Sequence, residues 1–215
     1  GKHSPADVSA CVACATGRWG DASISKHDVL HCAECPHGQY QHVIAQTACI
    51  ACPAGRHGTG GSLNSDCTSL CPVGKWSALS APLCTLCAVG KRGHVGDADN
   101  LRLTDAHCID CLAGYSQGTE GMPYCAPCMP GSYQGLTAQS SCIYCVDGQW
   151  SGPRIDACKL CSTGKYGGDA ATYPRNTSSH CRPCVPGKSQ GNTGQTACVA
   201  CAAGQDTVGE EATPA

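Results

Sequence analysis

The sequence predicts small disulfide-rich repeats, arranged as an elongated rod of short two-stranded β ribbons and turns with little or no helix. First, a unit of the form Cys-x-x-Cys-x-x-Gly occurs ten times, and an eleventh copy has one extra residue between its cysteines; together they contain all 22 cysteines. Second, Leu, Ile, Val and Phe make up only about 13% of the residues, too few for an ordinary hydrophobic core. Third, Gly, Pro, Ser, Thr, Asn and Asp punctuate every gap between units, which favours turns over helices.

Cross-links have to supply the stability that large apolar side chains supply elsewhere. Cysteine makes up about 10% of the chain. In the chain-entropy model a disulfide that closes a loop of ~15 residues contributes about 3 kcal/mol. Chains of this composition belong to oxidising compartments. We therefore expect a secreted or cell-surface, extracellular protein.

The units follow a longer period, which predicts the domain organisation. Cys11, Cys84 and Cys158 are separated by 73 and then 74 residues, and each period holds four units, here labelled A, B, C and D in chain order. We expect two full super-repeats and a partial third, at residues 11–83, 84–157 and 158–215. Gly1 precedes Cys11 by the same interval as Gly74 precedes Cys84. Residues 1–10 are therefore expected to be the tail of a truncated upstream repeat, in a segment of a longer array.

The glycine that closes each unit has a conformational explanation. After a Cys-x-x-Cys turn the chain must fold back, and a backbone with φ above zero suits glycine. Two residues later there is often an aromatic ring. We expect these rings to pack over the adjacent cystine as the largest apolar groups of each module. They are Trp19, Tyr40, Trp76, Tyr133, Trp150 and Tyr166.

The pattern Cys-x-x-Cys-x-x-Gly-x-aromatic, followed after about ten residues by another Cys-x-x-Cys, resembles the ephrin-receptor-like cysteine-rich repeats. These repeats are similar in appearance to tumour-necrosis-factor-receptor modules. Good local matches run from Cys32 to Gly55 and from Cys125 to Gly148. The resemblance implies a disulfide-rich extracellular repeat and leaves the function open. The extra residue between Cys67 and Cys71 and the long A-to-B loops depart from the family pattern. These departures point to a separate array, similar in style to surface proteins of protists and algae.

Two disulfide schemes are compatible with the spacing. In the sequential ladder, the second cysteine of each unit bonds to the first cysteine of the next. Cys11 and Cys201 are then left for bonds to neighbouring segments or chains. The other scheme interleaves pairs of units and leaves one unit unmatched, and the sequence does not decide between them. The ladder, which we favour, contains Cys14–Cys32, Cys35–Cys49, Cys52–Cys67, Cys71–Cys84, Cys87–Cys108, Cys111–Cys125, Cys128–Cys142, Cys145–Cys158, Cys161–Cys181 and Cys184–Cys198.

Zinc is the rival explanation of the cysteines, because two Cys-x-x-Cys pairs make a Cys₄ site. Eleven pairs is an odd number, so closed sites would leave one pair over. The chain also lacks the basic faces of most intracellular zinc modules. We favour disulfides, and expect no metal and no cofactor.

One polar pattern follows the longer period. Each long A-to-B loop has Gly-Asp-Ala near its start and His-Cys at its end, which gives the pairs Asp21/His31, Asp97/His107 and Asp169/His180. A functional interpretation is a metal or pH-sensitive contact repeated along the chain. The structural interpretation, which we favour, is an Asp-capped turn and a histidine that packs beside a cystine or between neighbouring modules. One carboxylate and one imidazole rarely hold a metal alone.

Other functional classes find no support in the sequence. There is no Gly-x-Ser-x-Gly elbow, HExxH motif or phosphate-binding glycine loop, so we expect no enzyme. The net charge is −2 and the basic residues are scattered, which does not favour nucleic acid. Apolar runs are only a few residues long, so we expect no membrane span in this segment.

The sequence therefore favours a structural role in a fibre, stalk or surface coat that contacts copies or repeats of itself. The alternative is the ligand-binding ectodomain of a receptor or adhesin, and a minor alternative is a zinc-binding repeat protein. Asn176-Thr177-Ser178 is an N-glycosylation sequon in the third long A-to-B loop, and we expect Asn176 to carry a glycan.

Overall fold

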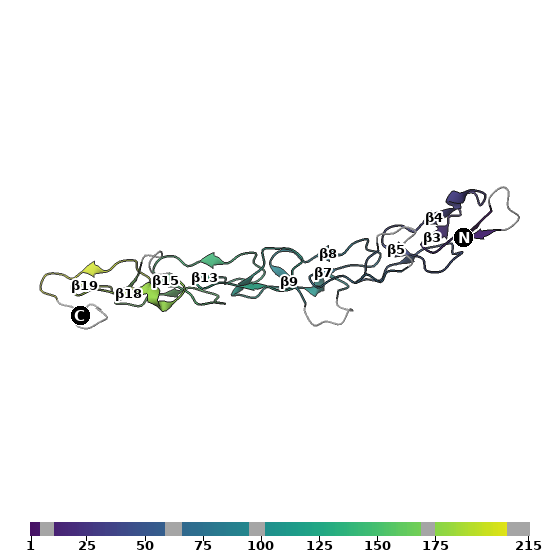
Figure 1. The fold of residues 1–215 in the computed structure, drawn as a ribbon. Helices are drawn as coiled ribbons and strands as arrows, with labels where there is room; N and C mark the ends of the chain where they lie inside the picture. The colour runs from purple at the N-terminus through teal and green to yellow at the C-terminus, as the bar shows by residue number, and fades with distance from the viewer. Residues whose placement is uncertain (5–10, 59–65, 95–101, 169–174, 206–215) are drawn as a thin grey trace. The chain divides into compact units, whose positions relative to one another are not determined.

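The computed structural model describes residues 1–4, 11–58, 66–94, 102–168 and 175–205. The chain forms two compact units. The first contains residues 1–88, 92–109 and 120–123, and the second contains residues 89–91, 110–119 and 124–215. Both are built from the same module, in which the strand after a unit glycine pairs with the residues between the next two cysteines. The described part of the chain is thus a set of small disulfide-rich repeats made of two-stranded ribbons (Figure 1).

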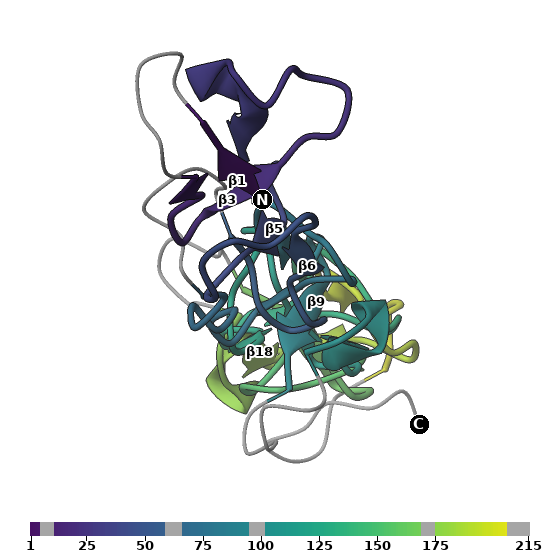
Figure 2. The same ribbon diagram turned by 90° about the vertical axis from the view of Figure 1, so that its right-hand side faces the viewer.

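Four ribbons lie within the first unit, and each is antiparallel. In the third, Gln39 pairs with Ala51 and Tyr40 with Ile50, and the two strands lie side by side in Figure 2. Arg56 and Leu70 form an isolated bridge where the next ribbon of the series is expected. The four ribbons are β1 (Lys2–His3) with β2 (Val12–Ala13), β3 (Arg18–Gly20) with β4 (Cys32–Glu34), β5 (Gln39–Tyr40) with β6 (Ile50–Ala51), and β7 (Lys75–Trp76) with β8 (Thr85–Leu86).

The remaining ribbons repeat this plan. They are β9 (Lys91–Gly93) with β10 (Cys108–Asp110), β11 (Tyr115–Ser116) with β12 (Ala126–Pro127), β13 (Ser132–Tyr133) with β14 (Ile143–Tyr144), β15 (Gln149–Trp150) with β16 (Lys159–Leu160), β17 (Lys165–Gly167) with β18 (Cys181–Pro183), and β19 (Lys188–Ser189) with β20 (Val199–Ala200). Among the described residues there is no α-helix. The same described ranges contain three short 3₁₀ turns, η1 (Val29–His31), η3 (Asp105–His107) and η4 (Ser178–His180).

The glycines of all eleven units adopt the left-handed conformation, with φ between 77° and 88°. The expectation of φ above zero is therefore confirmed. The next strand can then return antiparallel after every Cys-x-x-Cys turn, and an L side chain would be strained at these positions.

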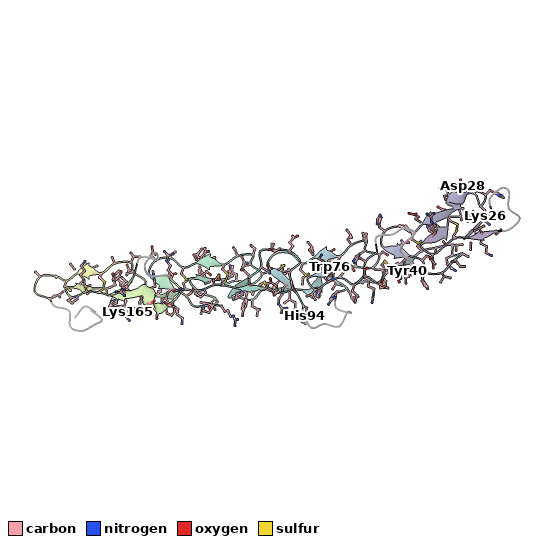
Figure 3. The ribbon with its side chains drawn as sticks, in the orientation of Figure 1. Lys26, Asp28, Tyr40, Trp76, His94 and Lys165 are labelled. Atoms are coloured by element: carbon pink, nitrogen blue, oxygen red, sulfur yellow. A yellow bond between two sulfur atoms is a disulfide. The ribbon has the colours of Figure 1, made fainter. Side chains whose placement is uncertain are left out.

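Ten disulfides join the modules, and they appear as yellow bonds in Figure 3. Each links the second cysteine of one unit to the first cysteine of the next, across 13 to 21 residues. The thiols of Cys11 and Cys201 are free.

Cystines form the core of both units. Every buried apolar residue of the described chain is a cysteine, whereas large side chains such as Tyr144, Met129 and Leu112 are exposed. The aromatic residues after the unit glycines are only half-buried, among them Tyr40 and Trp76, which Figure 3 labels. Some of them gain polar contacts at the surface, such as the Lys159 ammonium 5.2 Å from the Trp150 ring centre.

Candidate functional site: the buried histidine junctions

Three histidines recur with the long period and are buried at each recurrence in the described chain. His31, His107 and His180 retain 4%, 1% and 0% of their surface. Each is the last residue of a 3₁₀ turn and is followed by a disulfide-bonded cysteine. Asp28 caps the first turn by accepting from Leu30 N–H, and Thr104 caps the second by accepting from Ala106 N–H. Capping fixes the direction in which the turn delivers its histidine.

The second histidine shows what these rings do. The backbone N–H of Gly74, the glycine of a D unit, donates a hydrogen bond to Nε2 of His107 at 3.3 Å. Nε2 accepts here, so the ring is neutral and carries its proton on Nδ1. At the first junction, Nδ1 of His31 lies 3.0 Å from the Ile24 carbonyl, a position in which it donates. His107 therefore bonds an A-to-B loop to the D unit of the preceding super-repeat.

This hydrogen bond takes the place of a backbone contact used elsewhere. In most modules the unit glycine donates to the carbonyl of the residue three places after the next unit's glycine. Examples are Gly17 to Gln41 at 2.7 Å and Gly114 to Gln134 at 2.7 Å. At the D-to-A step that starts at Gly74, the imidazole of His107 supplies the acceptor instead. We call this arrangement the histidine junction.

A close backbone approach completes each histidine junction. A Cβ added at Gly93 would overlap the backbone of Gly74 and lie 3.0 Å from Nε2 of His107. Gly167 has the same relation to Gly148 and to His180, whose Nε2 would be 2.9 Å from such a Cβ. Only glycine leaves room for both the facing backbone and the ring.

The first junction repeats this geometry. A Cβ at Gly20 would overlap Gly1 and lie 3.0 Å from Nε2 of His31. Gly1 thus occupies the place that Gly74 and Gly148 occupy further along the chain.

The carboxylate of the Asp…His pattern belongs to a turn. Oδ1 of Asp21 accepts hydrogen bonds from the Ser23 hydroxyl at 2.7 Å and from Ser23 N–H at 2.9 Å. These two bonds, with a smaller contribution from His31, lower the pKa of Asp21 below its ordinary value. Asp97 and Asp169 lie outside the described residues. Within the described ranges no three His, Cys, Asp or Glu residues form a group that could hold a metal ion.

A basic residue accompanies each junction. The carbonyls of Lys26, Arg102 and Arg175 accept from Ser4, Ser77 and Ser151 N–H, at 2.7, 3.0 and 2.9 Å, which shows that the three are equivalent. Two of the three reach back to the preceding D unit. Nη1 of Arg102 donates to the Cys71 carbonyl at 2.6 Å, and the Arg175 guanidinium pairs with Asp147.

A further periodic signal in the sequence lies just after the unit glycines. The residue three places after the unit glycine is Gly in A units, Gln in B units and Ser in D units. Gln41, Gln117 and Gln190 are buried; each donates to a carbonyl seven residues later and accepts from an N–H two residues later. Ser77 and Ser151 of the D units are fully buried. These side chains connect modules or brace the loop within one.

The other sequence-predicted positions lie at the surface or close to it. Cys11 is exposed and Cys201 half-buried. Asn176 is exposed in a turn just before η4. None of the three takes part in a histidine junction, although Asn176 directly follows Arg175.

A comparison with protein families gives one match. Residues 23–71 match the family model described as "Tyrosine-protein kinase ephrin type A/B receptor-like". The chain carries an ephrin-receptor-like cysteine-rich repeat. The matched stretch includes His31 and runs through the disulfides Cys35–Cys49 and Cys52–Cys67 to Cys71. No curated protein matches the chain.

The matched repeat and the disulfides together indicate the compartment of the molecule. The ephrin-receptor-like repeat is a non-catalytic ectodomain module, and together with ten disulfides it indicates an extracellular, disulfide-stapled protein. Among the described residues, no helix is long and apolar enough to cross a membrane.

Proposed function

We propose that this protein is a structural extracellular component, a segment of a fibre, stalk or surface coat that assembles through disulfide-stapled repeats. The observation that carries the proposal is the recurrence of one junction with the same contacts. At each junction a glycine (Gly20, Gly93 or Gly167) lies against the backbone of Gly1, Gly74 or Gly148, so closely that an added Cβ would come within 2.3 Å of it. His107 and the junction glycines hold one module against the next.

A protein whose buried polar groups serve module-to-module contacts is suited to propagate along a chain. Each module of such a repeat protein contacts mainly its neighbours. The super-repeats at 11–83, 84–157 and 158–215 would then be successive copies of one building block. Contacts of this head-to-tail kind build open filaments when their rotation does not close a ring.

The free thiols fit the same proposal. Within the sequential register, Cys11 is the first cysteine of an A unit and Cys201 the second cysteine of a C unit. No cysteine within residues 1–215 occupies the register position that would pair with either. We assign both to bonds with neighbouring segments, so that the partners of this protein are its own repeats.

Glycosylation at Asn176 belongs to the proposal as a surface modification. The asparagine is exposed in a turn and starts an Asn-Thr-Ser sequon. A glycan there would leave the histidine junction in place, since His180 is buried while the Asn176 side chain faces solvent.

The experiment is sedimentation velocity of the native protein over a hundredfold range of concentration, with and without a reductant. A structural array is expected to give large species that grow with concentration and collapse on reduction. A monomer at every concentration would contradict it. Intact mass before and after peptide:N-glycosidase treatment, with Asn176→Gln as the control, checks the glycan. No mass loss on treatment would contradict glycosylation of Asn176.

A ligand-binding ectodomain of a receptor or adhesin is the second candidate, because the matched family model is described by ephrin receptors. A protein of this kind would remain monomeric in the sedimentation experiment. The zinc-binding alternative receives no support from the structure, in which 20 cysteines are in disulfides.

A further inference from the structure

A cavity of about 540 Å³ lies at the first histidine junction. Its lining includes Cys11, Trp19, Lys26 and His31. The residues equivalent to Lys26 at the second and third junctions are Arg102 and Arg175, and both contact a preceding D unit. The cavity therefore marks a face that a D unit covers at the other two junctions.

The basic residue of the first junction is less covered than its equivalents at the other two junctions. Arg102 and Arg175 are half-buried where they reach the Cys71 carbonyl and the Asp147 carboxylate. Lys26 is exposed, and its ammonium has no ion-pair or hydrogen-bond partner in the described part of the chain (Figure 3).

The first cysteine of the A unit is also less covered at the first junction than at the other two. Cys84 and Cys158 are half-buried and bonded to Cys71 and Cys145, the second cysteines of the two D units. Cys11 is equivalent to both, yet it is exposed and free. The backbone around it is already in the paired form, because β1 and β2 match β7 and β8 in register.

We infer that this cavity is a docking site for a peptide segment of the D-unit type, an extended Cys-x-x-Cys-x-Asp chain like residues 142–147. Its second cysteine bonds to Cys11, and its backbone carbonyl and its carboxylate face Lys26. The inference rests on the proposed function, since it names the partner of the first junction. The cation of Lys26 complements the acidic residue, as Arg175 complements Asp147.

The covalent step is a thiol–disulfide exchange. The Cys11 thiolate attacks the peptide sulfur of a peptide–glutathione mixed disulfide. A Cys11–peptide S–S bond forms while the peptide–glutathione bond breaks, and glutathione leaves as a thiolate that takes up the proton lost by Cys11. No net oxidation occurs.

The test compares the two free thiols of the full 215-residue chain. Cys201→Ser leaves only Cys11 free, and Cys11→Ser leaves only Cys201 free. Each variant is equilibrated with the glutathione mixed disulfides of two peptides, Ile-Tyr-Cys-Val-Asp (the sequence of residues 143–147) and the same peptide ending in Lys. Mass spectrometry gives the ratio of the two peptide adducts, and peptide mapping shows that the ten disulfides remain intact.

We expect the Asp peptide to exceed the Lys peptide by roughly fivefold on Cys11, the scale of one partly covered ion pair, and to equal it on Cys201. Lys26→Glu should reverse the order on Cys11. Equal ratios on both thiols, or an unchanged order in Lys26→Glu, would each overturn the inference. These variants each carry one free thiol, so the result does not depend on whether the native protein forms polymers.

Discussion

At the scale of single residues, the histidine junctions depend on close backbone contacts and on a buried hydrogen bond. Gly93 and Gly167 face the backbone of Gly74 and Gly148, and backbone cannot move aside as a flexible side chain can. The imidazole of His107 provides the acceptor for a buried N–H that would otherwise lack its bond. Removing space or removing an acceptor should therefore weaken the same contact in two different ways.

Gly167→Ala tests the requirement for space. The new Cβ would overlap the Gly148 backbone and lie 2.9 Å from Nε2 of His180. We expect a loss of about 1–3 kcal/mol, typical of overpacking, measured by guanidinium unfolding followed by tryptophan fluorescence. Gly152→Ala is the matched control, because no atom lies within 4 Å of its Cβ position and its φ is not left-handed. If the two variants unfolded at the same denaturant concentration, the close approach would have no energetic role.

His107→Ala tests the requirement for an acceptor. The Gly74 N–H would remain buried without its bond, which costs about 1–3 kcal/mol. Amide hydrogen exchange of Gly74 should accelerate accordingly. His107→Gln supplies an amide oxygen and should restore part of the protection, and His37→Ala, on an exposed histidine, should leave Gly74 unchanged. Equal exchange in the Ala and Gln variants would show that the ring contributes packing and no hydrogen bond.

At the scale of elements, each ribbon has only two or three residues per strand and does not form a stable hairpin alone. A disulfide and the backbone bond to the next module make up for this. For β13 and β14 these are Cys128–Cys142 and the bond from Gly131 N–H to the Ser151 carbonyl at 3.0 Å. Stability should therefore be local, in units of one module and its neighbours.

Replacing Cys128 and Cys142 together by Ser tests this locality. Loss of a bond that spans 14 residues should cost about 3 kcal/mol. Hydrogen exchange should increase between about residues 111 and 161 and stay unchanged around β5 and β6. The double variant of Cys35 and Cys49, which also spans 14 residues, should give the opposite distribution. Loss of protection along the whole chain in either variant would contradict nearest-neighbour stability.

At the scale of the whole molecule, the recurring junction connects the sequence period to a possible assembly. The 73- and 74-residue intervals that separate Cys11, Cys84 and Cys158 also separate Gly20, Gly93 and Gly167, the glycines of the histidine junctions. A contact that repeats in the chain can repeat between chains, which is the physical basis of the proposed filament. The docking cavity beside Cys11 is where such a continuation would begin.

Part of this organisation could be predicted from the sequence because it is local. The Cys-x-x-Cys-x-x-Gly spacing determines the turn, the left-handed glycine and the returning strand within about twenty residues. Other features are not local. His107 and Gly74 are 33 residues apart, and the sequence around either residue does not indicate that the two are in contact. The disulfide pairing stayed open for a similar reason, since nearly every unit has the same internal spacing and the cysteines' partners lie in other units.

The buried glutamines were missed because a polar residue in a turn is ordinarily taken to face solvent. Gln41 is instead folded over its own loop, donating to Ala48 and accepting from Val43. The regular change from Gly to Gln to Ser three places after the unit glycine is visible in the sequence. Its structural role can be explained only from the contacts with the neighbouring module.

The cystine core also determines how the protein responds to heat and cold. The heat-capacity change of unfolding grows with the apolar surface that unfolding exposes, and here the large aliphatic side chains are exposed already. The free energy of unfolding of this protein should thus vary little with temperature, with a small loss on cooling and a gradual decline on warming. For this molecule the redox potential of its surroundings, more than their temperature, is the variable that separates the folded chain from the unfolded one.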